Sequence, residues 1–211
     1  MSSSIFHSAG AVVACCGAAI GAPVEISFAP VAGNGSAARV QYSCVMDEVS
    51  QSVVSFRFTN GARGESSISD VYFQDGAFLG VSNLIQQGTL FVDSPGNLPG
   101  GGTMNPVFNA TRAFAADLGA SPAAGIESGR DFLEVRFTLI NNSTFADVLA
   151  ALGSGDLRVG MFVRPVGGGP GGESFVSMDG VVMPLPPAAW AGLSGLAAVG
   201  LLAFVRRRQA N

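Results

Sequence analysis

Period-two alternation of apolar and polar residues recurs along the middle of this chain. It occurs in 54–58, 132–139 and 157–164. The apolar positions are Val54, Phe56 and Phe58, then Leu133, Val135, Phe137 and Leu139, then Leu157, Val159, Met161 and Val163. Because successive side chains of a β-strand point to opposite faces, each segment is predicted to be a strand with one buried face.

Shorter strands are predicted between turn signals. They cover 24–29, 66–74, 88–93, 106–115 and 174–181, and Asp75-Gly76 and Asp179-Gly180 are typical turn pairs. Many short strands separated by Gly-rich turns favour a mainly β fold, an antiparallel β-sandwich of jelly-roll-like form.

One helix is predicted among these strands. Thr144 and Asp147 resemble a capping box, and the residues after Thr144 have helical spacing: Phe145, Val148, Leu149 and Leu152. Gly153 is expected to end the helix. This short helix should cover one open end or face of the sheets.

The N-terminal segment is predicted to be a signal peptide, residues 1–21. Residues 9–22 form a short apolar run that ends in small residues, which places the cleavage between Gly21 and Ala22. An alternative is that 12–15 is a degenerate lipobox, in which case Cys15 is acylated. Cys15 and Cys16 both lie in the leader, so Cys44 is the one cysteine expected in the mature chain, as a buried thiol or as a reactive or pairing thiol.

The C-terminal segment contains a long apolar run without charge, Ala188–Val205. As a helix its 18 residues would extend ~27 Å, close to the ~30 Å hydrocarbon core of a bilayer. Arg206, Arg207 and Arg208 follow directly, and the positive-inside bias would hold them in the cytoplasm. We therefore expect one transmembrane helix at 188–205, with the preceding domain on the other side; the alternative is a buried core helix.

The junction before that helix resembles a known sorting signal. Met183, Pro184, Leu185, Pro186 and Pro187, followed by the apolar helix and three arginines, look like the PEP-CTERM class of exosortase signals, and especially its Val-Pro-Leu-Pro-Ala variant. Met183 here replaces the Val and Pro187 the Ala. The resemblance implies export in a Gram-negative bacterium and processing near Pro184–Pro186 by a membrane-embedded exosortase, which supplies the catalytic residues.

Most of the segment 52–177 also resembles a recurring PEP-CTERM ectodomain. The similarity lies in 58–60, 67–76, 94–101, 144–148, 157–160 and 173–176. Members are exported proteins, often of bacteria that make extracellular polysaccharide, and the resemblance implies no activity.

Residues 22–182, here called the body, lack the usual catalytic bases. His7 in the leader is the chain's one histidine, and the chain has no lysine. A Ser-His-Asp triad and a zinc site with the common ligands are thereby excluded from the body. Eight arginines and fifteen carboxylates give the body a formal net charge of −7, which disfavours nucleic-acid binding. We expect no cofactor and no metal.

Carboxylate chemistry is the remaining catalytic possibility. The closest groupings are Asp47 with Glu48, Asp70 with Asp75, and Asp131 with Glu134. Solvated surface acids are the expected role, and a structural calcium site or a glycoside-cleaving pair are the alternatives.

The Gly-rich stretches 95–102 and 167–172 are interpreted as long turns rather than phosphate-binding loops, because neither ends in Gly-Lys-Ser/Thr. Tyr72, Phe73 and Phe78 are expected to pack in the core, and an exposed sugar-stacking face is the alternative.

The predicted organisation is a signal peptide (1–21), a β-sandwich ectodomain (22–182) and a C-terminal sorting signal (183–211). The predicted function is an exported, exosortase-sorted surface or matrix protein without catalytic activity. Its partners would be an exosortase and the membrane. A carbohydrate-binding module that contacts exopolysaccharide is the second hypothesis, and a carboxylate hydrolase the third.

Overall fold

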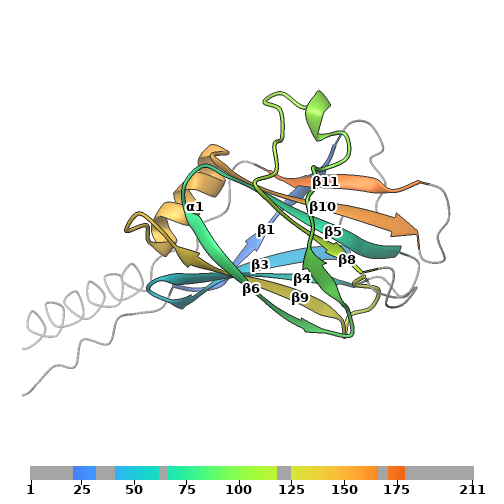
Figure 1. Ribbon diagram of the computed structural model, residues 1–211, viewed down its shortest axis with the longest axis horizontal. Coiled ribbons are helices and arrows are strands. Elements are labelled where there is room, and N and C mark those ends of the chain that lie inside the picture. The colour runs from blue at the N-terminus through green and yellow to red at the C-terminus, as the bar shows by residue number, and fades with distance from the viewer. Residues whose placement is uncertain (1–20, 32–40, 62–65, 118–124, 166–170, 179–211) are drawn as a thin grey trace, which may run out of the picture.

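Two antiparallel sheets and one α-helix make up the part of the chain that the computed structural model describes, residues 21–31, 41–61, 66–117, 125–165 and 171–178 (Figure 1). Sheet A has the strand order β1-β3-β4-β9-β6, and sheet B the order β2-β11-β10-β5-β8-β7. Sheet A comprises β1 Val24–Ile26, β3 Tyr42–Ser50, β4 Val53–Asn60, β9 Phe132–Leu139 and β6 Leu79–Gln87. Sheet B comprises β2 Phe28–Pro30, β11 Glu173–Ser177, β10 Leu157–Pro165, β5 Ser66–Asp75, β8 Arg112–Ala116 and β7 Phe91–Asp93.

The three alternating segments are confirmed as strands, within β4, β9 and β10. The shorter predictions are less accurate. The predicted strand at 24–29 is divided at Ser27 into β1 and β2, the predicted strand at 88–93 shrinks to β7, and the one at 106–115 begins only at Arg112. The alternation did not reveal β6, since its register shifts between Leu79 and Ser82 and leaves Val81 exposed.

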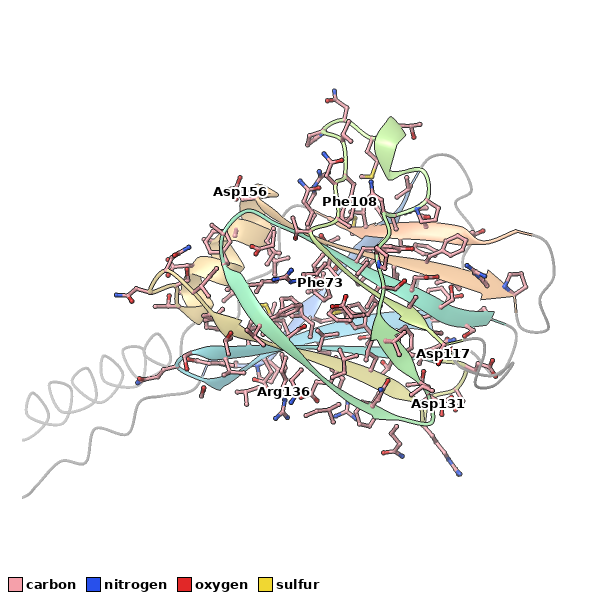
Figure 2. The ribbon with its side chains drawn as sticks, in the orientation of Figure 1. Phe73, Phe108, Asp117, Asp131, Arg136 and Asp156 are labelled. Carbon is pink, nitrogen blue, oxygen red and sulfur yellow. The ribbon has the colours of Figure 1, made fainter. Side chains whose placement is uncertain are left out.

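Both sheets contribute side chains to one hydrophobic core. Phe73 of β5 lies at its centre (Figure 2), with its ring centroid 5.1 Å from that of Phe56 in β4 and 4.9 Å from that of Phe137 in β9. The rings meet edge to face, the arrangement that their quadrupoles favour.

The chain crosses between the sheets at both pairs of edge strands. On one side β1 of sheet A leads through Ser27 into β2 of sheet B, and on the other side β6 leads through residues 88–90 into β7. At the second crossing the Gln86 side chain bonds both the N–H and the C=O of Phe91. Each edge of one sheet is thus joined covalently to the matching edge of the other.

Gly88 at this second crossing has φ +69°, a conformation that favours glycine. A Cβ there would lie 2.0 Å from Oδ1 of Asp131, whose Oδ2 accepts hydrogen bonds from the N–H and hydroxyl of Ser128. We expect Gly88→Ala to lower the free energy of unfolding by about 2 kcal/mol, measured by urea denaturation, because Asp131 must move and the backbone is strained.

Gly153→Ala is the matched control, since nothing lies within 4 Å of the Cβ it would add. It should raise the free energy of unfolding by up to about 1 kcal/mol, the helix-propensity difference. Equal effects of the two substitutions would contradict the role given to Gly88.

Helix α1, Phe145–Ser154, has the predicted capping box at Thr144 and Asp147. The Thr144 hydroxyl and N–H hydrogen-bond the Asp147 carboxylate and lower its pKa. The expected end at Gly153 is wrong: the helix continues to Ser154, and Gly155 caps it in the left-handed conformation. The helix packs against β10 and lies at one end of the sheets (Figure 1).

The prediction of one buried face also needs correction for β10 in sheet B. Arg158, on its expected polar face, is only 5% exposed. Residues 94–111, here called the long loop, fold over the outer face of sheet B (Figure 1). Leu98 and Phe108 of the loop pack there with Tyr72 and Val176. A second, smaller core results.

Candidate functional site

Gly21 and Ala22, at the predicted cleavage bond, are the first two residues that the structure describes. The Gly21 N–H donates to Oε2 of Glu48 at 2.6 Å, and a Cβ at Gly21 would lie 2.8 Å from the Phe145 ring of α1. Ala22 is exposed. The remaining predicted site residues, Met183 to Pro187 and Arg206 to Arg208, lie outside the described residues.

The last described strand runs back toward the end of the body where Gly21 lies. β11 is antiparallel to β2, and the Met178 N–H donates to the Ser27 C=O at 2.9 Å. Because β1 and β2 lead away from Gly21, β11 leads toward it. The chain therefore enters the body at the α1 end and leaves it heading toward that end.

Three of the carboxylates singled out by the sequence, Asp75, Asp131 and Glu134, bond to residues close to them in the chain. Asp75 accepts from the N–H groups of Phe78 and Leu79, each at 2.9 Å, and so shapes the turn into β6. Glu134 pairs with Arg136 at 2.6 Å, and Asp131 bonds Ser128. Within the described ranges, no group of three His, Cys, Asp or Glu residues is placed to hold a metal ion.

The aromatic trio forms no exposed platform. Phe73 is fully buried, Tyr72 is 6% exposed, and Phe78 packs against the main core. Burial, with a contribution from Asp70, raises the pKa of Tyr72 to about 12. Cys44 is buried as expected, and burial raises the pKa of its thiol well above the usual value. It is therefore a poor nucleophile.

Arg158 fastens the long loop to sheet B, a role that the sequence did not reveal. Its guanidinium donates to the Pro106 C=O at 2.9 Å, to Oε1 of Gln74 at 2.6 Å and to the Val107 C=O. The Phe108 ring lies beside it, with its centroid 5.3 Å from the guanidinium carbon. These contacts hold residues 106–108 of the long loop in place. Phe108 is labelled in Figure 2.

A hollow of about 270 Å³ lies between the two ends of the long loop. Residues 93–96 line one side and residues 110–113 the other. The Ser94 N–H donates to the Ala113 C=O at 3.0 Å, and Oδ1 of Asn97 accepts from the Ala110 N–H at 3.0 Å. Both walls are thus fixed by hydrogen bonds.

Comparisons with protein-family models, with curated proteins and with solved structures found no significant match. In the described part of the chain no helix is both long enough and apolar enough to span a membrane. The predicted span at 188–205 lies outside that part.

Proposed function

We propose that this chain is an exported, exosortase-sorted protein of the PEP-CTERM type that acts at the cell surface or in the extracellular matrix without catalytic activity. The carrying observation is the order of three sequence features: the prolines of 184–187, the uncharged apolar run 188–205, and Arg206 to Arg208. An uncharged run of bilayer length followed by three arginines is typical of a segment that stops in the membrane with its end in the cytoplasm.

The direction of the chain at both ends of the body supports this proposal. The body begins at the α1 end, and β11 leads back toward that end. The nine residues from 179 to 187 could reach about 30 Å when extended. The proposed membrane segment would therefore begin within about 30 Å of Met178.

The fold in this proposal is a β-sandwich of jelly-roll-like form. Its support is the shared core, in which rings of β4 and β9 meet a ring of β5, and the two crossings that join the edges of the sheets. Two sheets packed face to face about 10 Å apart are the feature that a crystal structure should contain.

A non-catalytic role is proposed from the residue types in the body. It contains no histidine or lysine. Its described carboxylates at Asp75, Asp131 and Glu134 have local structural partners. These residues support a protein that is delivered to the surface or matrix and acts there by binding or as a structural component.

Sorting is tested by measuring the intact mass and location of the chain in an exosortase-containing Gram-negative host. We expect a mature species that lacks residues 1–21 and the tail after the processed junction. Replacing Pro184 and Pro186 together by Ala should leave the tail attached, because the exosortase then loses its signal.

Pro99→Ala, in an exposed loop, is the matched control and should be processed normally. Deleting the host exosortase should reproduce the effect of the Pro184 and Pro186 substitutions. A mature species that keeps residues 188–211 in the unmodified host would show that the segment is only an anchor.

A further inference from the structure

The hollow between the two ends of the long loop is lined by a carboxylate and a guanidinium. Asp93 lies at the end of β7 and Arg112 at the start of β8, and both are exposed. Within the described ranges, neither side chain has an ion-pair or hydrogen-bond partner. A carboxylate and a guanidinium that line one hollow without bonding each other are available to a ligand.

The charges in this hollow narrow the class of ligand. One negative and one positive group leave it without net charge, so neither a simple cation nor a simple anion is favoured. The Asp93 carboxylate accepts hydrogen bonds, the Arg112 guanidinium donates them, and the hydroxyl of Ser94 does both. A ligand with adjacent groups that both donate and accept matches this set, which is the property of neighbouring hydroxyls on a sugar ring.

The walls and the size of the hollow agree with a single sugar unit. Pro95, Ala110 and Ala113 add aliphatic surface, against which the C–H face of a sugar ring can pack. The volume of about 270 Å³ lies just below the range of about 300–1,000 Å³ usual for larger ligands. The hydrogen bonds that fix both walls reduce the cost of ordering the site on binding.

We propose that this hollow binds one neutral sugar residue through Asp93 and Arg112. The site differs from the stacking platform considered for Tyr72, Phe73 and Phe78, since it relies on hydrogen bonds rather than exposed rings. It does not depend on the sorting tail. Binding is measured on the purified protein, whereas sorting is measured in the host, so either proposal can fail alone.

The test is saturation-transfer NMR on the full chain in a detergent that has no sugar headgroup. The probes are the methyl glycosides of glucose, galactose and mannose, with glycine and sulfate as charged competitors. We expect at least one glycoside to bind with a Kd of about 1 mM, as suits one small polar unit. Asp93→Asn and Arg112→Gln should each weaken binding about tenfold, the loss of one charge-assisted hydrogen bond.

Asp47→Asn and Arg130→Gln are the matched controls, because they make the same charge changes outside the hollow. Both should bind like the unmodified chain. The proposal is overturned if no glycoside binds, if glycine or sulfate displaces the bound glycoside, or if the controls weaken binding as much as the substitutions in the hollow do. Unchanged thermal unfolding of all four variants would show that the loss is local.

Discussion

Phe73→Ala should lower the free energy of unfolding by about 4 kcal/mol, the usual cost of removing a fully buried phenylalanine ring. Phe73 touches the rings of Phe56 and Phe137 from the opposite sheet, and it also meets Phe58 and Phe114. Its removal leaves a cavity where the two sheets meet. Urea denaturation of the full chain, followed by circular dichroism, measures the change.

Phe132→Ala is the matched control on the outer face of sheet A. Its ring is covered by the guanidinium of Arg57, whose central carbon lies 3.8 Å from the ring centroid. Losing that half-exposed contact should cost about 1 kcal/mol. If the two phenylalanine substitutions cost the same, the sheets do not share the core described above.

The sequence predicted those elements whose signals are local. The capping box at Thr144 and Asp147 and the alternation of 132–139 depend only on nearby residues, and both are found in the structure. In contrast, β6 was missed because the register shift before Ser82 breaks its alternation and leaves Val81 77% exposed. A rule that counts periods cannot recognise a strand whose pairing is irregular.

The same distinction between local signals and long-range contacts applies to the candidate sites. The proposed sorting tail is a contiguous stretch of sequence, 184–208, so the proposal can be made without any structure. Asp93 and Arg112 are far apart in the sequence and come together only because β7 pairs with β8. Similarly, alternation alone placed Arg158 on a polar face, whereas its hydrogen-bond partners Pro106 and Val107 lie more than 45 residues earlier in the chain.

Arg158 also offers a test of how the long loop and the hollow depend on each other. Arg158 does not line the hollow, but it holds Pro106 and Val107, just before Ala110 in its second wall. Gln74 extends this link, because its Oε1 accepts from Arg158 and from the Asn109 N–H at 2.8 Å. Removing the Arg158 guanidinium should therefore loosen the second wall of the hollow, although Arg158 does not line it.

Arg158→Met should lower the free energy of unfolding by about 3 kcal/mol, since it leaves carbonyl groups beneath the loop without their donor. The amides of Asn109 and Ala110 should exchange with deuterium faster, and glycoside binding should weaken although Asp93 and Arg112 remain. Arg164→Met, on the same strand, is the matched control: its guanidinium is about half exposed and lies 3.8 Å from Asp70, so its loss should cost under about 1 kcal/mol. Equal costs, or unchanged exchange at Asn109, would mean that the loop is held by Leu98 and Phe108 packing and not by Arg158.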